Sequence, residues 1–593
     1  MIKYFTLVLF SQLIFNVFAG NRINYTDPSD GAKYINIENN ITLGFENTLT
    51  CTEKDLPGCI KVTGSSGRSY SGKLILLPGS KKIIFSPGIN YLPGETITVS
   101  INGKLLRSLS HKSKNVLSFE TSRVKPVWNP LQGIQNEFEG DISGYENPVI
   151  SDPLTLPVMT VTINNNPEPG FLFLSNIRFG GQYTPYLIIT DKNAVPYSYL
   201  QLNANGMDFK KQPNGNLTYF SVGKSKFYEL SPAFILLDSF YCGNGYRTDQ
   251  HELQVLPNHH AFLMSYDVQV VNMSLIVPGG DTAANVTGLV LQEIDENKNV
   301  VFQWRSWDHF LITDALHENL LAHNIDAVHC NAIELDNDGN IMISSRHLDE
   351  ITKINRATGA IIWRMGGLNN QFTFINDPIR FTYQHAIRRI SNGNITIYDN
   401  GNFHSPKVSR AVEYSLNEVT KTAAQVWEFK NTPAIYGSAM GNVQRLPGGN
   451  TLISWGTTNP TVTEVTPAGT KAFQMTFPAG TYTYRVFKFP WGGPPTSSGH
   501  ETGMMPKIYK LSQNYPNPFN PVTNISFDIP KASYTNITVY DILGRSVKNL
   551  VSGNYRPGSY ETTFDGSNFS SGLYFCVMKS GEFFSVQKMI LIK

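Results

Sequence analysis

The stretch that decides the fold is residues 329–347, which read HCNAIELDNDGNIMISSRH. Two runs of alternating apolar residues flank a turn at Asn337, Asp338 and Gly339, and this is the pattern of a β-hairpin. The same pattern recurs in HELQVLPNHHAFLMSYD from His251, HAIRRISNGNITIYDNG from His385 and GNVQRLPGGNTLISWGT from Gly441. The chain therefore repeats one hairpin along its central part.

Three of these units continue into a second strand pair that ends in tryptophan, at Trp304, Trp363 and Trp427. Four strands in each unit are typical of a propeller blade, and the region 124–490 has room for about five to seven blades. A stack of separate sandwiches is the alternative. The constant order of strand, turn, strand and Trp favours a ring, because closure removes exposed sheet edges.

The composition agrees with an all-β chain of several domains. The 593 residues include 48 Gly and 34 Pro, and 41% of them are hydrophobic, which is enough for several cores joined by tight turns. The 48 Lys and Arg nearly balance the 46 Asp and Glu, and no basic block is present. Nucleic acid is therefore not an expected partner.

Three of the hairpins carry a histidine at the start of their first strand, namely His251, His329 and His385. Equivalent positions in a propeller converge on its axis, so we expect the three rings to meet there, with Arg346 returning to the same end of its hairpin. Three histidines could bind zinc. A neighbouring guanidinium would repel a divalent cation and suits a tetrahedral oxyanion, so the sequence predicts an anion site and no metal.

The segments HCNAIELDNDGNIMISSRHLDEITKINRATGAIIWRMGG, QHAIRRISNGNITIYDNG and VFQWRSWDHF resemble the bacterial arylsulfotransferase family. The resemblance covers roughly Val161 to Phe489. The family transfers a sulfuryl group between phenols without a nucleotide, and its members are six-bladed propellers with a small N-terminal β domain. The resemblance thus implies a six-bladed propeller. With an N-terminal Ig-like β-sandwich and a small C-terminal β-sandwich, which the residues before and after it predict, the whole chain is expected to be all-β.

The resemblance also implies roles for individual residues. His385 would be the nucleophile that carries the sulfuryl group, and the other anion-site positions would be His251, His329, Arg346 and Asn331. The implied reaction is ping-pong: an aryl sulfate donor gives its sulfuryl group to neutral His385, and a phenolic acceptor then removes it. Arg346 is the permanent charge for the sulfuryl oxygens, while His251 and His329 share oxyanion and proton roles that the sequence does not divide between them.

Further residues are candidates on chemical grounds. Asp249 and Asp326 stand two and three residues before a histidine and could orient the rings. Tyr266, Trp307 and Tyr398 are expected to line an aromatic-accepting mouth. The sequence has no GxxxxGK[ST] loop, so no nucleotide or other cofactor is expected.

Both ends of the chain indicate export. Residues 1–19 have a basic start, an apolar run and a small-x-small end, as in a signal peptide. YPNPFNP, VYDILGR and SSGLYF near the C-terminus resemble the sorting domain of type IX secretion, here residues 509–593. We therefore expect secretion or display at the cell surface, with the type IX machinery as a partner.

The remaining segments complete the expected organisation. Residues 20–123 are predicted to form the Ig-like β domain, residues 124–490 the propeller, and residues 491–508 a Gly-, Pro- and Ser-rich linker. Cys51 and Cys59 are close enough along the chain for a local disulfide, whereas Cys242, Cys330 and Cys576 are expected to be buried thiols.

Two other functions stay open at this point. The propeller could be a surface module that binds sulfated ligands without catalysis, or a sulfatase in which water replaces the acceptor. A homodimer is possible for the family, although no residue pattern indicates one.

Overall fold

The computed structural model describes residues 22–49, 52–79, 81–101, 116–123, 156–178, 184–492, 497–498, 508–514, 516–531, 533–555 and 558–593. Across these residues the regular structure is almost entirely β-strand. The helices described there are short 3-10 turns: η1 (Glu53–Asp55), η2 (Val222–Lys224), η3 (Met273–Leu275), η4 (Ser306–Asp308), η5 (Ile312–Asp314) and η6 (Arg346–Leu348). The expected all-β class is confirmed.

The N-terminal part consists of two antiparallel sheets that share one apolar core. One sheet has the order β1 (Ile23–Asp27), β2 (Ile41–Phe45), β6 (Lys82–Pro87), β5 (Gly72–Leu76). The other has the order β4 (Ser69–Tyr70), β3 (Ile60–Gly64), β7 (Thr96–Ile101), β8 (Val116–Glu120). Alternate residues of both sheets, including Ile41, Phe85 and Val99, form the buried layer between them.

The described residues of the central part, between 160 and 489, form six sheets of four or five strands that follow one another along the chain, together with one two-stranded sheet. The first has the order β37 (Phe487–Phe489), β10 (Phe171–Ser175), β12 (Tyr186–Thr190), β13 (Pro196–Gln201), with β38 (Ser497–Ser498) at its edge. The second has β14 (Gly206–Lys211), β15 (Leu217–Ser221), β16 (Lys226–Leu230), β17 (Leu236–Phe240). A small two-stranded sheet joins β11 (Ile177–Arg178) to β36 (Thr481–Tyr482).

The third and fourth sheets carry two of the hairpins quoted above. The third has β18 (Leu253–Val255), β19 (Ala261–Val271), β20 (Ala284–Ile294), β21 (Val300–Arg305), and β22 (Asn324–Asp326) pairs with β20. The fourth has β23 (Cys330–Leu335), β24 (Ile341–Ser345), β25 (Glu350–Ile354), β26 (Ile361–Gly366).

The fifth and sixth sheets follow the same plan. The fifth has β28 (His385–Arg389), β29 (Ile395–Asp399), β30 (Arg410–Asn417), β31 (Thr422–Lys430), with β27 (Thr373–Ile375) beside β31. The sixth has β32 (Asn442–Arg445), β33 (Thr451–Ser454), β34 (Val462–Val465), β35 (Lys471–Thr476), with β9 (Thr160–Asn164) beside β35. Each hairpin seen in the sequence is therefore the first strand pair of a sheet.

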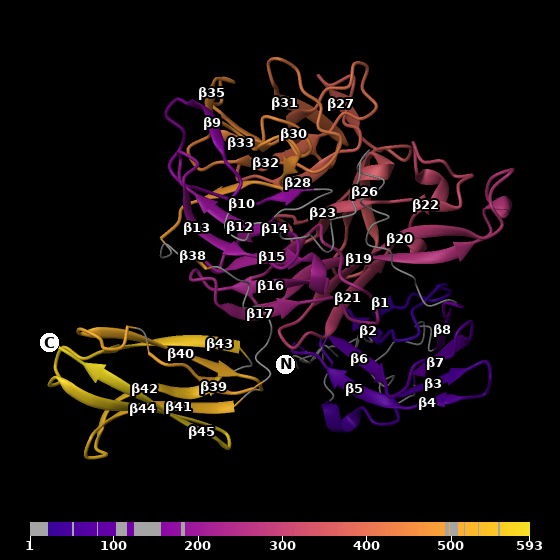
Figure 1. Ribbon diagram of the computed structural model, residues 1–593. Helices are drawn as coiled ribbons and strands as arrows, with labels where there is room; N and C mark the ends of the chain where they lie inside the picture. Colours follow the sequence, from indigo (N-terminus) through magenta and orange to yellow (C-terminus); the bar gives the residue numbers. More distant parts are fainter. Residues whose placement is uncertain are drawn as a thin grey trace, which may run out of the picture.

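The two ends of this central part exchange strands. β9, the first strand of the region, adds to the sixth sheet, and β37, the last strand, adds to the first sheet with Phe173 paired to Phe487. First strands of successive sheets lie beside one another, as β18 with β23, β23 with β28 and β28 with β32. The exchange ties the beginning of the region to its end (Figure 1).

The N-terminal sheets pack against the third sheet (Figure 1). The Tyr25 hydroxyl donates to the carbonyl of Gln303 at 2.9 Å, and Lys82 Nζ donates to the carbonyl of Val301 at 2.6 Å. Tyr25 also stacks on Phe302, with ring centroids 5.4 Å apart. Buried polar and aromatic contacts of this kind join the two parts firmly.

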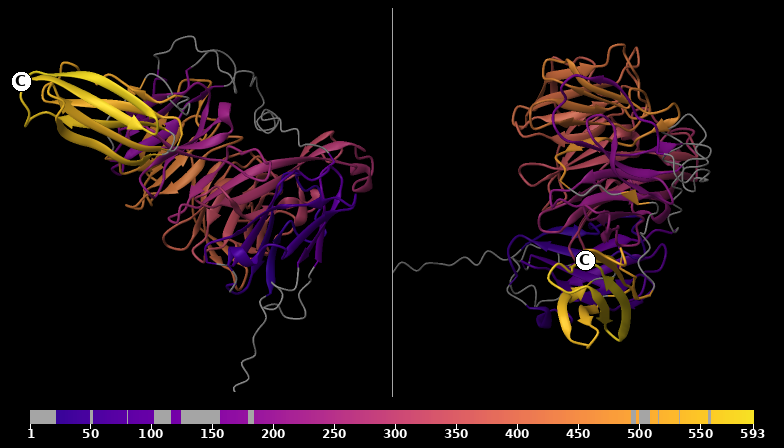
Figure 2. Two further views of the ribbon diagram at one scale, coloured as in Figure 1. Left: turned by 90° about the horizontal axis from the view of Figure 1, so that it is seen from below. Right: turned by 60° about the vertical axis from the view of Figure 1, so that its left-hand side comes forward.

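The C-terminal part is a second small pair of sheets with its own core, drawn in yellow in Figures 1 and 2. One sheet has β39 (Lys510–Leu511), β40 (Val522–Ile529), β43 (Gly558–Asp565), and the other has β42 (Ser546–Tyr555), β41 (Ser533–Asp541), β44 (Gly572–Ser580), β45 (Phe583–Leu591). Ile525, Val539 and Met589 lie in the shared core.

Several expectations concern residues outside those described. The signal peptide of residues 1–19, Cys51 of the expected disulfide and most of the 491–508 linker belong to this group. Cys242, Cys330 and Cys576 are buried thiols, as expected, and burial raises the pKa of Cys330 and of Cys576 to about 12. In the described part of the chain, no helix has the length and apolar character needed to cross a membrane.

Candidate active site

The three histidines that begin their strands lie together. The ring centroids of His251 and His329 are 5.1 Å apart, and those of His251 and His385 are 6.3 Å apart. All three side chains are buried, with at most 3% of each residue exposed. The structure therefore gathers residues that are more than 130 positions apart in the chain, as the repeat predicted.

His385 is oriented by a neighbouring sheet. Its Nδ1 lies 2.8 Å from the carbonyl oxygen of Gly441, which precedes β32. A carbonyl can only accept, so Nδ1 carries the hydrogen and Nε2 of the neutral ring carries the lone pair. Gly441 begins its hairpin at the position that is histidine in the third, fourth and fifth sheets.

The backbone at His385 departs from a regular strand. The register of β28 with β29 shifts between His385 and Arg388, and Ala386 has φ 54°. Non-glycine residues rarely adopt this left-handed conformation, which costs on the order of 1 kcal/mol and occurs where a side chain must be aimed. His329 has the same feature, with φ 47°.

Asn331 spans the gap between the fourth and fifth sheets. Its Nδ2 donates to the carbonyl of Gln384 at 2.8 Å, and its Oδ1 accepts from the backbone N of Ala386 at 3.3 Å. These two bonds bracket His385. The side chain that the resemblance assigns to the anion site thus also holds the peptide groups on both sides of the nucleophile candidate.

Each of the other two histidines has a carboxylate partner. Asp249 Oδ1 lies 2.5 Å from His251 Nδ1, and Asp326 Oδ2 lies 2.7 Å from His329 Nδ1. The expectation that these aspartates orient the rings is confirmed by these contacts. A carboxylate that accepts from Nδ1 fixes the orientation of its imidazole ring.

Arg346 is held on several sides at the start of η6. Nη2 donates to the carbonyl of Ser438 at 2.9 Å, Nη1 lies 3.1 Å from His347 Nε2, and the guanidinium lies 4.1 Å from the centre of the Tyr383 ring. Its backbone N donates to the carbonyl of His329 at 2.9 Å. Among the described residues, the buried Nε has no hydrogen-bond partner, so it remains available to an anion.

His347 is a site residue that the sequence analysis did not single out. Its Nδ1 donates to the carbonyl of Asp326 at 2.6 Å, which leaves Nε2 to accept from Arg346. Burial lowers the pKa of His347 to about 3, and the charge of Arg346 acts in the same direction, so the ring is neutral. Its position directly after Arg346 in the sequence was the available signal.

Three of these side chains satisfy a distance criterion for a metal site. The ligand atoms of Asp326, His329 and His347 lie within 4.8 Å of one another. However, the guanidinium of Arg346 lies against His347, and Asp326 is already bonded to His329. A fixed positive charge at this point favours an anion over a divalent cation.

Tyr484 is a second residue that sequence reasoning missed. Its hydroxyl donates to the carbonyl of His251 at 3.1 Å and lies 3.4 Å from His385 Nε2. It precedes β37, the strand that joins the first sheet from the far end of the region. Tyr484 therefore occupies in the first sheet the position that the histidines occupy in the third, fourth and fifth sheets. In the sequence, however, it comes near the end of the repeat.

The three aromatic residues expected at the substrate mouth lie in different places. Tyr266 is beside the histidines, because its hydroxyl donates to the carbonyl of Cys330 at 2.7 Å and lies 3.4 Å from His251 Nδ1. Trp307 packs 5.3 Å from Tyr34 of the N-terminal part. Tyr398 is fully buried and donates to the carbonyl of Trp455 at 3.1 Å, so it belongs to the core behind Gly441.

A buried group of charges lies next to the histidines. Arg485 donates to Asp208 and Glu252 at 2.9 Å each, and Arg388 donates to Glu252 at 2.6 Å. Burial opposes ionisation of Glu252, but Arg388, Lys210 and Arg485 outweigh it and lower the pKa of that carboxyl. Arg485 also donates to the carbonyl of Asn331, so this charged network stabilises the backbone at Asn331, the residue that positions His385.

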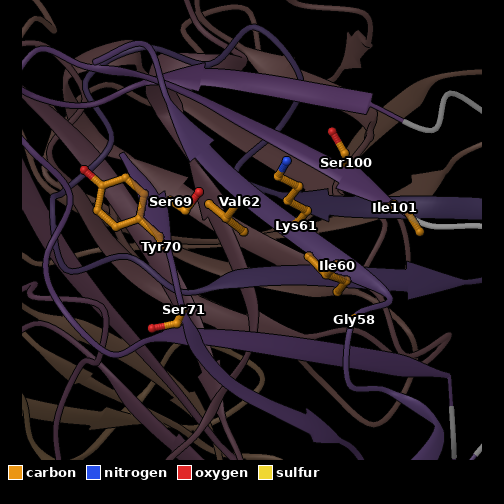
Figure 3. Close-up of a pocket in the computed structure, with 9 residues that line it drawn as sticks. All are labelled: Gly58, Ile60, Lys61, Val62, Ser69, Tyr70, Ser71, Ser100 and Ile101. Carbon is orange, nitrogen blue, oxygen red and sulfur yellow. The ribbon is translucent and has the colours of Figure 1, made fainter. Parts of the chain in front are cut away.

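Open cavities are found elsewhere on the protein. One of about 570 Å³ lies on the β4-β3-β7-β8 sheet, lined by Lys61, Ser69 and Tyr70 among others (Figure 3). One of about 410 Å³ includes Lys210 and Arg388. In the described part of the chain, His251, His329 and His385 are buried.

The protein thus has an all-β fold of repeated four-stranded sheets, with three buried histidines at the starts of first strands and a buried arginine directly after β24. The chain belongs to the arylsulfotransferase (ASST) family, whose profile matches residues 160–485. Residues 513–593 match the secretion system C-terminal sorting domain, and residues 20–121 match the bacterial Ig-like domain. The sorting domain indicates type IX secretion to the cell surface and interaction with that machinery.

No curated protein sequence matches the chain. Among solved structures, a protein of unknown function from Bacteroides caccae is 11% identical, with a TM-score of 0.33 over 54% of this chain and 98% of the other. Virginiamycin B lyase from Staphylococcus aureus with quinupristin is 10% identical, with a TM-score of 0.29 over 62% and 96%. PorZ, a surface component of the type IX secretion system of Porphyromonas gingivalis, is 11% identical, with a TM-score of 0.29 over 88% and 68%.

Proposed function

We propose that this protein is an exported aryl sulfotransferase that moves a sulfuryl group from a phenolic sulfate ester to an acceptor phenol through a sulfohistidine at His385. The proposal rests chiefly on one observation. His385 Nδ1 donates to the carbonyl of Gly441, so Nε2 is the nucleophilic nitrogen of a neutral imidazole, and that nitrogen belongs to a buried group with His251.

In the first half-reaction, Nε2 of His385 attacks sulfur and the sulfur to aryl-oxygen bond breaks. The departing phenolate takes a proton from His251 or His329, each of which is paired with an aspartate. In the second half-reaction, the acceptor hydroxyl returns a proton to that histidine, and its oxygen takes the sulfuryl group from His385. The proton balance over both halves is zero.

Arg346 supplies the permanent positive charge. Sulfuryl transfer spreads negative charge over the equatorial oxygens, as phosphoryl transfer does, so a preorganised guanidinium lowers the barrier. The contacts with Ser438, His347 and Tyr383 keep it in place before substrate arrives. Tyr266 and Tyr484 are proposed to contact the substrate, in view of their distances to His251 and His385.

The six sheets are proposed to be the blades of a six-bladed propeller, closed where β9 and β37 exchange ends. The proposed organisation along the chain is a signal peptide (1–19), an Ig-like domain (20–123), the propeller (124–490), a linker (491–508) and the sorting domain (509–593). The match of the family profiles to residues 20–121, 160–485 and 513–593 supports these boundaries.

The test is to incubate the purified protein with 4-nitrophenyl sulfate, with and without phenol. Release of nitrophenol that requires phenol, with phenyl sulfate as the second product, is expected. Release of free sulfate without phenol would indicate a sulfatase instead, and no release would leave only a sulfate-binding module. Mass spectrometry of a stopped reaction should locate a sulfuryl adduct on His385, which His385→Asn loses and His323→Asn, at an exposed histidine, keeps.

A further inference from the structure

Three consecutive residues contact the side chains and backbone that surround Arg346. They belong to the loop between η5 and β22, and we call residues 316–318 the cover segment. The backbone N of Leu316 donates to the carbonyl of His347 at 3.1 Å, and His317 Nε2 lies 2.8 Å from Asp349 Oδ2. Glu318 accepts a hydrogen bond from the Tyr383 hydroxyl. The cover segment therefore contacts the same residues that hold Arg346.

The carboxyl group of Glu318 lies beside His347, the residue that contacts Arg346. Its Oε1 lies 3.5 Å from Nδ1 of His347, and the other nitrogen of that ring lies 3.1 Å from Arg346 Nη1. Burial raises the pKa of Glu318 and the charge of Asp326 adds to this effect, while the Tyr383 hydrogen bond, His329 and Arg346 oppose it. The Glu318 carboxylate thus interacts electrostatically with His329 and Arg346, two residues of the proposed anion site.

A negative charge beside an anion site repels a doubly charged anion more strongly than a singly charged one. An aryl sulfate carries one negative charge, whereas an aryl phosphate of the same shape carries two above its second pKa of about 6. Arg346 alone would attract the dianion more strongly. The repulsion from a carboxylate also doubles for the dianion, so it offsets that advantage.

We propose that Glu318 determines specificity, by making the site select singly charged sulfate esters over doubly charged phosphate esters. This inference rests on the proposed function of the site. At an effective dielectric constant of about 20, one additional unit of charge repulsion over about 12 Å corresponds to a discrimination on the order of tenfold. Glu318 acts here by its charge, and its hydrogen bond to Tyr383 positions that charge.

The test is calorimetric binding of benzenesulfonate and of phenyl phosphate to the full-length protein at pH 8.5. Neither probe needs turnover. In Glu318→Gln, whose amide still accepts from Tyr383, the affinity for phenyl phosphate relative to benzenesulfonate should rise about tenfold. Glu318→Asp keeps the charge and should keep the wild-type ratio, as should Glu46→Gln at an exposed position of the N-terminal part.

Each result has a definite meaning. If wild-type protein binds benzenesulfonate and the ratio is unchanged in Glu318→Gln, the inference is wrong while the proposed function stands. Glu318→Ala provides a second check, because it must shift the ratio in the same direction even if the glutamine variant folds poorly. If the wild type binds neither probe, the inference fails, and turnover of 4-nitrophenyl sulfate decides separately whether the proposed function fails with it.

Discussion

The carbonyl oxygen of Gly441 accepts a hydrogen bond from His385 Nδ1 at 2.8 Å, and this contact joins equivalent positions of two neighbouring sheets. The glycine has φ +90°, which an L side chain rarely adopts. The Tyr398 ring and the carbonyl of Ser454 fill the space beside it. Gly441 of the sixth repeat unit thus orients His385 of the preceding unit.

Gly441→Ala tests this relationship. A Cβ would lie 2.5 Å from Tyr398 Cε1 and 2.7 Å from the carbonyl oxygen of Ser454, so the backbone must shift. We expect a loss of about 1–3 kcal/mol of stability and at least a tenfold lower kcat with 4-nitrophenyl sulfate. Gly393→Ala is the matched control, because Gly393 has φ +87° in a turn with nothing within 4 Å of the added carbon. Equal kcat losses in the two variants would contradict the orienting role.

Asn331→Ala should act on catalysis through His385. The change removes the bonds to Gln384 and Ala386, so the left-handed backbone at the nucleophile loses its support. We expect kcat to fall by about ten- to a hundredfold with a small change in KM. Asn442→Ala, at the start of the sixth sheet, removes the corresponding pair of hydrogen bonds to Val486, which precedes β37 of the first sheet. That variant should lose similar stability and much less of kcat, and the opposite ranking would count against a positioning role for Asn331.

Tyr484→Phe removes a hydroxyl that lies 3.4 Å from His385 Nε2 and donates to the carbonyl of His251. We expect about 1 kcal/mol of destabilisation from the lost buried bond and a three- to thirtyfold lower kcat. Tyr246→Phe is the control, because in the described structure the buried Tyr246 hydroxyl has no hydrogen-bond partner. Steady-state kinetics and thermal melts of both variants give the comparison, and unchanged kinetics for Tyr484→Phe would remove Tyr484 from the site.

His347 should make the fold sensitive to acid. Its pKa is lowered to about 3 in the folded protein by burial, whereas an unfolded histidine has a pKa of about 6.5. The unfolded state therefore binds a proton first, so the stability contributed by the neutral ring is complete above pH 6.5 and is lost as the pH falls toward 3. Between pH 6.5 and pH 5 this loss is roughly 2 kcal/mol.

The measurement is urea denaturation of wild type and His347→Gln at pH 7 and pH 5, followed by tryptophan fluorescence. The glutamine does not titrate, so the variant should lose about 2 kcal/mol less on acidification than the wild type. His323→Gln, at a histidine whose side chain is 59% exposed, should behave as wild type. Parallel acid losses in all three proteins would show that His347 does not bind its proton mainly in the unfolded state.

The repeat allowed much of the site to be predicted. The hairpins that start at His251, His329 and His385 are the first strand pairs of three sheets, and their starts converge as expected. The partners Asp249 and Asp326 could also be predicted, because each stands two or three positions before its histidine in the chain, close enough for the two side chains to meet. Strand periodicity and turn residues are local properties, so the sequence displays them directly.

Residues that act across sheets could not be found in this way. Tyr484 comes to His385 because β37 joins the first sheet from the end of the region, and Glu318 comes from a loop with no periodic pattern. Trp307 and Tyr398 were expected at the mouth, yet one packs on the N-terminal part and the other in the core. The type of a residue gives its chemistry, but which neighbours it meets depends on long-range packing.

The sequence by itself determined the all-β class, the hairpin repeat, the sorting domain and the three histidines with Arg346, because each is written in local spacing or in a motif. Only the tertiary structure decided that the carbonyl of Gly441 sets the tautomer of His385, that neutral His347 holds Arg346, and that Glu318 closes over both. Hydrogen bonds between sheets depend on distances and angles between segments far apart in the chain, and no local pattern encodes those.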